Sequence, residues 1–267
     1  MQIWTHDHKV LVVSIDTPRP PLDTAAISQK ISQYWRVSVV EVTGSTQDDL
    51  AALVARNEAK NGEVLVTEFQ SAGRGRLDRT FEAPQSSALL FSLYLEPKRA
   101  KSEWSFLPLL AGLVSTLAIS ELDPRFTAEL KWPNDLQISG KKLGGIIAQA
   151  TNSGVILGIG INVGMNRSEL PVEHATSLMI EEFAVLDRNL LLASILNTCE
   201  ELLKRWEDGE DLRHLYRERS ATLGQKIQVE LPGGEQKSGF AEDISPDGEL
   251  ILEGGQRITV GDIVHLR

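Results

Sequence analysis

Apolar and polar residues alternate along the chain with two different periods, which separate helical segments from strands. A period near 3.6 residues predicts helices at 24–35, 47–60, 104–122, 187–207 and 211–221. Short runs of branched apolar residues predict strands at 36–42, 63–68, 87–95, 135–138, 142–149 and 155–163. This mixture of helices and strands predicts an α+β layer architecture.

Two very short connections determine how the last three of these strands pair. Ser139-Gly140 joins the first strand to the second, and residues 152–154 join the second to the third. A parallel crossover needs about a dozen residues or more, so these strands must be antiparallel neighbours. We therefore predict a mixed, largely antiparallel sheet covered by helices, and not a doubly wound dinucleotide-binding fold.

The last part of the chain has a different composition. Residues 221–267 hold 8 of the 21 glycines and show no helical period, and short apolar alternations are broken by Pro-Gly and Gly-Gly turns. This pattern predicts a separate small β-barrel domain of four or five strands. The chain is thereby divided into an N-terminal extension at 1–21, a main domain at 22–220 and the small domain at 221–267.

Composition and charge exclude several classes of protein. No stretch approaches the ~20 uninterrupted apolar residues of a membrane span, and the polar start of the chain does not resemble a secretory signal. Cys199 is the only cysteine, which excludes an intrachain disulfide and suits a reducing, cytoplasmic setting. The net charge of −10 argues against a protein whose main task is to coat nucleic acid. The five histidines show no metal-ligand spacing, so no metal site built from side chains is expected.

A loop at 70–79 alternates glycine with arginine and carries three arginines against one aspartate. Glycine lets the backbone approach a ligand closely, and the guanidinium groups suit phosphate or carboxylate. A solvated turn or an RNA contact would have the same composition. The loop is not a P-loop, because no Lys-Ser or Lys-Thr follows at the required spacing. It is not a dinucleotide fingerprint either, because Asp78 stands where the third glycine should be.

A second candidate is Lys131-Trp132-Pro133-Asn134-Asp135. Pro133 keeps the preceding residue extended, and Pro-Asn-Asp favours a tight turn. Lys131 is therefore fixed at a strand end, where its ammonium could face a reacting acyl or phosphoryl group. The alternative is a surface lysine beside a structural tryptophan.

Two further motifs have a functional and a structural interpretation. In the strand 155–163, alternation places Gly158, Gly160 and Asn162 opposite an apolar face, so a ligand or a packed helix could lie against them. Gly144-Gly145 on the preceding strand adds to the same space. The segment 44–47, Gly-Ser-Thr-Gln, begins a helix, where hydroxyl and N–H groups either hold a polar ligand or only cap the helix.

Taken together and in order, five segments resemble the biotin protein ligases (biotin–[acetyl-CoA-carboxylase] ligases). They are GSTQ at 44–47, QSAGRGRLDR at 70–79, KWPND at 131–135, KLGGI at 142–146 and GIGINV at 158–163. The likeness covers roughly residues 37–265. It implies a biotin/lipoate ligase-like catalytic domain at 22–220, followed by the small domain.

The resemblance implies a two-step reaction. Biotin and ATP give biotinyl-5′-AMP and pyrophosphate, and a lysine of a biotin carboxyl carrier domain then displaces AMP. Catalysis is assigned to Lys131 and Arg76. The implied biotin contacts are Ser45, Thr46, Gln47, Gln70, Arg74, Gly75, Arg76, Lys131, Gly144, Gly145, Gly158 and Gly160. The implied contacts to ATP and the adenylate are Arg74, Arg76, Arg79, Lys131 and Asn162, with Mg²⁺ accompanying ATP.

The resemblance also sets expectations about partners and regulation. The carrier domain of acetyl-CoA carboxylase or a related carboxylase is the expected partner, with no membrane and with the enzyme as a monomer or homodimer. Only 43 residues precede Gly44, and about 20 of them belong to the catalytic domain, which leaves too few for a helix-turn-helix domain. We therefore expect a monofunctional ligase that binds no DNA. The arginine loop should close over the adenylate and exclude water.

Two departures from the family pattern lie in the loop. The family usually has glycine where this chain has Asp78, and tryptophan where it has Phe81. An aspartate tolerates the left-handed backbone better than most residues, but its charge lies among the arginines. Three other readings stay open: a lipoate–protein ligase, a nucleic-acid-binding module, and an inactive scaffold in which Asp78 has abolished turnover.

Overall fold

The computed structural model describes residues 19–76 and 79–266. The helices are α1 (Thr24–Ser28), α2 (Thr46–Ala55), the 3-10 helix η1 (Lys101–Phe106), α3 (Leu107–Leu122), α4 (Arg188–Glu207) and α5 (Arg213–Arg219). The strands are β1 (Arg36–Thr43), β2 (Glu63–Gln70), β3 (Ala88–Leu95), β4 (Glu129–Lys131), β5 (Asp135–Ile138), β6 (Lys141–Ala150), β7 (Val155–Asn162), β8 (Lys226–Glu230), β9 (Gln236–Ile244), β10 (Leu250–Leu252), β11 (Gln256–Ile258) and β12 (Asp262–His265). The first 18 residues of the predicted extension at 1–21 lie outside the described residues.

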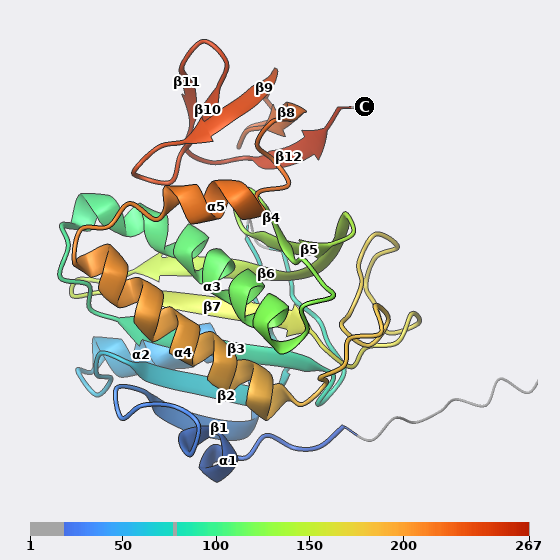
Figure 1. Cartoon of the computed structure of the whole chain (residues 1–267). Coiled ribbons are helices and arrows are strands. Elements are labelled where there is room, and N and C mark those ends of the chain that lie inside the picture. Colours follow the sequence, from blue (N-terminus) through green and yellow to red (C-terminus); the bar gives the residue numbers. More distant parts are fainter. Residues whose placement is uncertain (1–18, 77–78, 267) are drawn as a thin grey trace, which may run out of the picture.

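Seven strands form one sheet in the order β1-β2-β3-β7-β6-β5-β4 (Figure 1). Strands β1 and β2 run parallel, and every other neighbouring pair in this sheet is antiparallel. The prediction that β5, β6 and β7 are antiparallel neighbours is therefore confirmed, and so is the mixed, largely antiparallel sheet. Short turns between these strands leave the chain no room for any other pairing.

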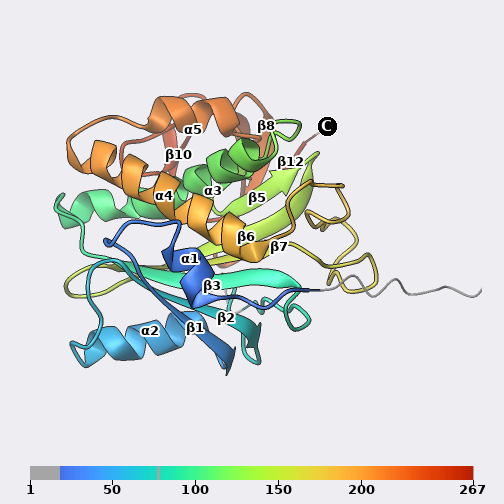
Figure 2. The same cartoon turned by 60° about the horizontal axis from the view of Figure 1, so that its bottom comes forward.

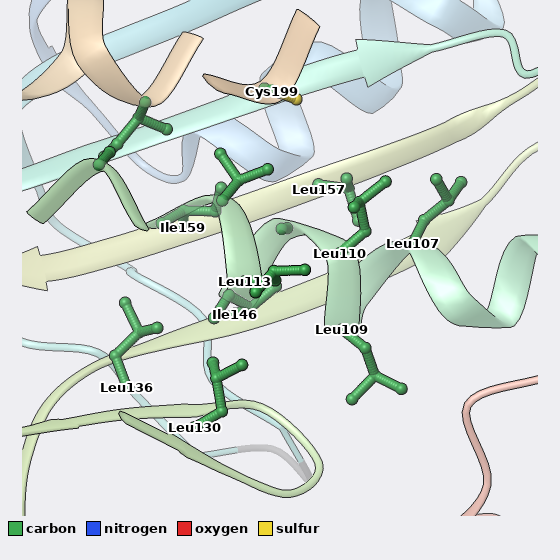
Figure 3. Close-up of a cluster of buried hydrophobic side chains, with 14 of the residues drawn as sticks. Leu107, Leu109, Leu110, Leu113, Leu130, Leu136, Ile146, Leu157, Ile159 and Cys199 are labelled. Atoms are coloured by element: carbon green, nitrogen blue, oxygen red, sulfur yellow. The ribbon is translucent and has the colours of Figure 1, made fainter. Parts of the chain in front are cut away.

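The helices lie on both faces of this sheet in unequal numbers. Figure 2 shows α1, α3 and α4 on one face and α2 alone on the other. Alternate residues of each strand point to opposite faces, so Leu157 and Ile159 of β7 lie in the core, beside Leu110 and Leu113 of α3 (Figure 3). Buried apolar side chains fill this layer, whereas the opposite face is only partly covered by α2.

Helix α3 occupies the centre of the core. Together with η1 it forms a 22-residue helical segment, Lys101–Leu122, that is long and apolar enough to cross a membrane, but 67% of its most apolar window is buried inside the protein. It packs against α4 and β6, and a helix that is apolar on all sides is what such a central position requires. The predicted helix at 104–122 begins as a 3-10 turn, and α3 has Pro108 in its first turn.

Two predicted helices are shorter in the structure than the periodicity indicated. The helix predicted at 24–35 is only α1, because a turn follows in which Ser32 Oγ accepts a hydrogen bond from the Tyr34 N–H at 3.1 Å. Helix α2 ends at Ala55 rather than at residue 60, because Asn57 adopts a left-handed backbone with φ of 56°. Serine and asparagine form local bonds that compete with helix, which apolar spacing does not reveal.

A second, five-stranded antiparallel sheet has the order β11-β10-β9-β8-β12. The small domain was predicted as a barrel, but this sheet does not close, since β11 and β12 are its edges. Over the described residues β11 pairs only with β10 and β12 only with β8, so no ladder between the two edge strands closes the sheet. The sheet lies against the end of the first one (Figure 1), where Trp132 Nε1 donates to the Gly248 carbonyl at 3.0 Å.

Candidate active site

A cavity of about 850 Å³ lies on the α2 side of the large sheet, beside the start of that helix. All fourteen residues that the sequence selected line this one cavity: Ser45, Thr46, Gln47, Gln70, Arg74, Gly75, Arg76, Arg79, Lys131, Gly144, Gly145, Gly158, Gly160 and Asn162. The cavity wall is completed by Asp262, Ile263 and Val264 of β12. Segments far apart in sequence therefore meet at a single site.

The start of α2 builds a neutral polar wall. Ser45 caps the helix and accepts a hydrogen bond from the Asp48 N–H, and the Thr46 N–H donates to Gln70 Oε1 at 2.8 Å. The Thr46 hydroxyl lies 2.8 Å from Ser92 Oγ, deep in this network. Capping and ligand binding are thus compatible here, because one hydrogen-bonded network both ends the helix and faces the cavity. A buried, satisfied network of this kind holds its groups in fixed orientations.

Gln47 links this polar wall to the sheet. Its side-chain Nε2 donates to the Ile156 carbonyl at 3.2 Å, and its Oε1 accepts from the Ser92 hydroxyl at 3.3 Å. Only 3% of its surface is exposed. Gln47 is therefore rigidly placed at the edge of the cavity.

The arginine loop places three cations at the cavity, and each one contacts a protein acceptor. Arg74 pairs with Asp48 at 2.5 Å, and Arg79 pairs with Asp262. Arg76 donates to Asn134 Oδ1 at 3.2 Å. Burial lowers the pKa of Arg76, although nearby carboxylates act against this. Guanidinium groups stay charged in proteins, so the loop brings three positive charges to the cavity wall, two of them paired with carboxylates.

Lys131 supplies a fourth cation from the end of β4. The next residue, Trp132, is 1% exposed, and its backbone N–H donates to Thr222 Oγ1 at 3.0 Å, which fixes the strand end. Within residues 19–76 and 79–266, the Lys131 ammonium has no hydrogen bond and no ion pair. Burial lowers the pKa of His265 on β12, and the positive charge of Lys131 lowers it further. Lys131 is therefore an uncommitted cation that faces the cavity.

The four glycines of β6 and β7, against which the alternation allowed either a ligand or packed protein, have protein atoms close to them. A Cβ on Gly158 would lie 2.6 Å from Gln47 Oε1, and one on Gly160 would lie 2.8 Å from the ring of Phe81. A Cβ on Gly144 would overlap the Gly160 backbone. A Cβ on Gly145 would only reach ordinary contact, with the Asn134 carbonyl oxygen at 3.7 Å. Three of the four glycines thus permit close packing within the protein, and Gly145 has the least crowded surroundings.

Asn162 is held at the base of the cavity. Its Nδ2 donates to the Thr176 carbonyl at 2.9 Å, and the residue is 5% exposed. One N–H of the amide is therefore committed to the fold, and the side-chain oxygen has no hydrogen-bond partner among the described residues.

Several cavity residues were not predicted from the sequence. Lys142 forms an ion pair with Asp135 at 2.5 Å, and Asp262 reaches the site from the second sheet. Phe81 covers Gly160 from the end of the arginine loop. Both partners of the Lys142–Asp135 pair lie within motifs that were recognised, so their spacing was a usable signal. No local pattern marks Asp262, because its role depends on how the two sheets meet.

The cavity combines a neutral polar wall with a cluster of cations. A polar, uncharged group suits the hydrogen-bonding start of α2, and anionic groups suit the opposite side, where Lys131 and the loop arginines lie. Such a site can bring two anions together and relieve their repulsion, which is the requirement for joining a carboxylate to a phosphate. Within the described residues, no cluster of three or more His, Cys, Asp or Glu side chains could hold a metal ion.

Comparison with known proteins gives consistent matches over both sheets. Residues 39–166 match the model of the biotin/lipoate A/B protein ligase family, and residues 222–266 match that of the biotin protein ligase C-terminal domain. The biotin–[acetyl-CoA-carboxylase] ligase of Mycobacterium tuberculosis is 38% identical over 94% of this chain and 98% of its own length. The bifunctional ligase/repressor BirA of Escherichia coli is 28% identical over 81% of this chain and 69% of its own length.

A solved structure has the same fold. The biotin protein ligase from Aquifex aeolicus in complex with biotin and ATP superposes with a TM-score of 0.74 at 28% identity. The match covers 87% of this chain and 99% of that one.

Proposed function

The chain belongs to the biotin/lipoate A/B protein ligase family, and from this premise we infer that it is a biotin–protein ligase. It activates biotin with ATP to biotinyl-5′-AMP and transfers the biotinyl group to a lysine of a biotin carboxyl carrier domain. The observation that best supports this function is the single cavity in which the polar start of α2 faces Lys131 and the arginine loop. Such a site matches a ligand with a neutral polar head and a carboxylate tail, placed against a nucleotide phosphate.

The two ends of biotin would contact opposite walls of the cavity. The ureido ring is neutral and rich in donors and acceptors, so it suits Ser45, Thr46 and Gln47 at the start of α2, together with Gln70. The apolar ring and chain would lie along the glycine strands β6 and β7, where Gly145 is the least crowded of the four glycines. The carboxylate would then point towards Lys131 and the arginines.

In the first step, a carboxylate oxygen of biotin attacks the α-phosphorus of ATP, and the bond to the bridging oxygen of pyrophosphate breaks. Both reactants are anions, so their repulsion opposes the approach. Lys131 would contact the carboxylate and the α-phosphate together, while Arg76 and Arg79 would hold the phosphates. Arg74 would leave Asp48 to join them, and Asn162 would offer its side-chain oxygen to the nucleotide.

In the second step, the neutral amine of the acceptor lysine attacks the carbonyl carbon of the mixed anhydride. The bond to the phosphate oxygen breaks, AMP leaves, and the amine loses a proton to solvent. The Lys131 ammonium would stabilise the negative charge that develops on the carbonyl oxygen and on AMP. The same lysine thus serves both steps.

Mg²⁺ is proposed to enter with ATP. This ion is bound mainly through substrate phosphates and water, with one or two carboxylates from the protein. Asp135 lines the cavity and carries such a carboxylate, which is held at 2.5 Å from Lys142. The ion, when bound, would offset phosphate charge.

We also propose that the acceptor is the carrier domain of acetyl-CoA carboxylase or a related carboxylase, and that the enzyme works in the cytoplasm. The M. tuberculosis relative bears a name that specifies acetyl-CoA carboxylase. The only cysteine, Cys199, is buried on α4, and burial raises the pKa of its thiol to about 12, which agrees with a reduced, unreactive residue.

The function is tested by ATP-dependent attachment of labelled biotin to a purified carrier domain, with pyrophosphate release measured in parallel. Isothermal titration with biotin and with lipoate distinguishes the two ligase types. Binding of lipoate without binding of biotin would exclude the biotin ligase, and absent pyrophosphate release with both acids would indicate an inactive scaffold. Filter binding to RNA with a steep salt dependence would instead favour the nucleic-acid module.

Replacing Gly158 with alanine is expected to weaken biotin binding by about tenfold, because a new methyl group would displace Gln47, the rigid edge of the polar wall. Isothermal titration measures the change. The matched control is Gly44→Ala, since no atom lies within 4 Å of a Cβ at that position. Equal losses in both proteins would contradict the assignment of Gln47 to the biotin wall.

Replacing Arg76 with alanine is expected to give an enzyme that still forms the adenylate but releases it to solvent, because the loop loses a contact to phosphate. The free adenylate is measured by chromatography after the enzyme is filtered away. The control, Arg56→Ala, removes an exposed arginine that pairs with Glu58 away from the cavity. Retention of the adenylate as in the wild-type protein would remove Arg76 from the lid.

A further inference from the structure

Two arginines of the arginine loop, Arg76 and Arg79, contact the second sheet. Arg79 pairs with Asp262, and Arg76 Nη1 lies 3.4 Å from the Gly261 carbonyl and 3.9 Å from Asp262 Oδ1. Apart from the bond of Arg76 to Asn134, these are the side-chain contacts of the two arginines among the described residues. The small C-terminal sheet therefore carries an anchor for the loop.

The anchor itself is firmly placed. Asp262 begins β12 and pairs in register with Glu230 of β8. A Cβ on the preceding residue, Gly261, would overlap a methyl group of Val229 and lie 3.0 Å from the Glu230 carbonyl. The backbone at 261–262 is thus packed directly on β8, and the Asp262 carboxylate projects from it into the cavity wall. A fixed carboxylate facing a glycine-rich loop limits where the loop can rest.

The contacts with Asp262 leave N–H donors of the arginine loop available to bind phosphate. A guanidinium group has five N–H donors, and the contact of Arg76 with Asp262 is long, so donors of Arg76 stay available for phosphate. Arg79 is 65% exposed and Asp262 is 30% exposed at the side chain, so their ion pair is accessible to solvent. Such a pair changes the balance between open and closed loop by a few fold, not by orders of magnitude.

We propose that Asp262 is a positioning residue that holds the arginine loop closed over the acyl-adenylate through Arg79 and Arg76, and that the small domain thereby retains the intermediate. This proposal rests on the proposed ligase function. The aspartate does not touch the reacting atoms. It sets the position of the loop that separates the anhydride from water.

The test measures release of the intermediate rather than its formation. Enzyme is loaded with labelled biotin and ATP, freed of excess ligand, and followed for loss of adenylate without carrier domain. The Asp262→Asn variant is expected to release the adenylate three to five times faster than wild type. Asp262→Glu should restore retention, and Glu235→Gln, which removes the same charge from the same sheet beside Lys237, should leave it as in wild type.

A double-variant cycle checks that the effect acts through the proposed contact. Arg79→Ala should raise the release rate to a similar extent, and the double variant should release no faster than Asp262→Asn alone. Release at the wild-type rate in either single variant, or multiplying effects in the double variant, would overturn the anchor. If Asp262→Asn melts below the assay temperature, Arg79→Ala and Asp262→Glu still decide the question.

A second readout separates the anchor from the ligase function. Trypsin cleaves after arginine, so an unanchored loop should be cut faster at residues 74–79 in ligand-free Asp262→Asn than in wild type. If wild type forms no adenylate from biotin and ATP, the ligase function fails while cleavage still tests the anchor. If wild type forms the adenylate but cleavage is unchanged by Asp262→Asn, only the anchor fails.

Discussion

Replacing Lys131 with alanine should lower the rate of ATP-dependent pyrophosphate release by at least about 100-fold. Arg74, Arg76 and Arg79 are each engaged by protein acceptors, whereas the Lys131 ammonium has no partner among the described residues and faces the cavity. It is therefore the cation that can reach the biotin carboxylate and the α-phosphate without first breaking an ion pair. Removing it leaves the repulsion between the two anions unrelieved at the moment of attack.

Two further variants make this prediction specific. Lys141 lies on β6 of the same sheet as Lys131 and pairs with Glu181. The Lys141→Ala variant should therefore retain nearly full activity. Lys131→Arg keeps the charge but changes its shape, so it should recover part of the lost rate. Pyrophosphate release by Lys131→Ala within tenfold of the wild-type rate would contradict the central role of this lysine.

The predicted site residues come together in one cavity, but the sequence did not describe the surface of that cavity. Lys131 and the arginine loop were predicted at strand ends, and the fold of the sheet brings these ends to the same cavity. For Gly158 and Gly160 the sequence left open whether a ligand or a packed helix lies against them, and in the structure Gln47 and the Phe81 ring lie there. Which side chain covers a glycine depends on contacts between distant segments, and alternation along one strand does not contain that information.

The second sheet shows the same limit at the level of the fold. Its strands and turns were predicted from glycine-rich breaks, but closure into a barrel depends on the stagger and pairing of the edge strands, and β11 and β12 do not pair over the described residues. Asp262 was likewise not predicted to line the cavity, because it reaches the cavity only through the contact between the two sheets. Local patterns therefore predicted elements and chemistry, while long-range packing decided shape and contacts.

The second large effect is expected on stability, at a buried ion pair that does not line the cavity. Arg188 at the start of α4 and Glu68 on β2 lie 2.7 Å apart, with side chains only 3% and 7% exposed. Arg188 also donates to the Pro20 and Ala88 carbonyls, and the Leu22 N–H donates to Glu68. The pair thus connects residues 20–22, which precede α1, to the large sheet. Arg188→Met should lower the free energy of unfolding by about 3–5 kcal/mol, because it leaves a buried carboxylate unpaired.

The same ion pair should make the stability of the wild-type protein depend on pH in the acid range. Burial alone would raise the pKa of Glu68, but the bonds from Leu22 and Arg188 outweigh it and hold that pKa below its ordinary value. A carboxyl group with a lowered pKa in the folded state stabilises the protein above the pKa of the unfolded chain, about 4.3, and this stability is lost as the pH falls through the folded-state pKa. The free energy of unfolding, measured with urea, should therefore fall more steeply below about pH 4 for wild type than for Glu68→Gln.

The double variant Glu68→Gln with Arg188→Met distinguishes a lost ion pair from a general packing defect. It removes both charges, so no ion stays buried, and it should recover part of the stability that Arg188→Met loses. The exposed pair Arg56–Glu58 provides the comparison, since Arg56→Met should change the free energy of unfolding by no more than about 1 kcal/mol. A double variant as unstable as the sum of its two single variants would show that the charges of Arg188 and Glu68 act independently, and that the ion pair does not hold this corner of the fold.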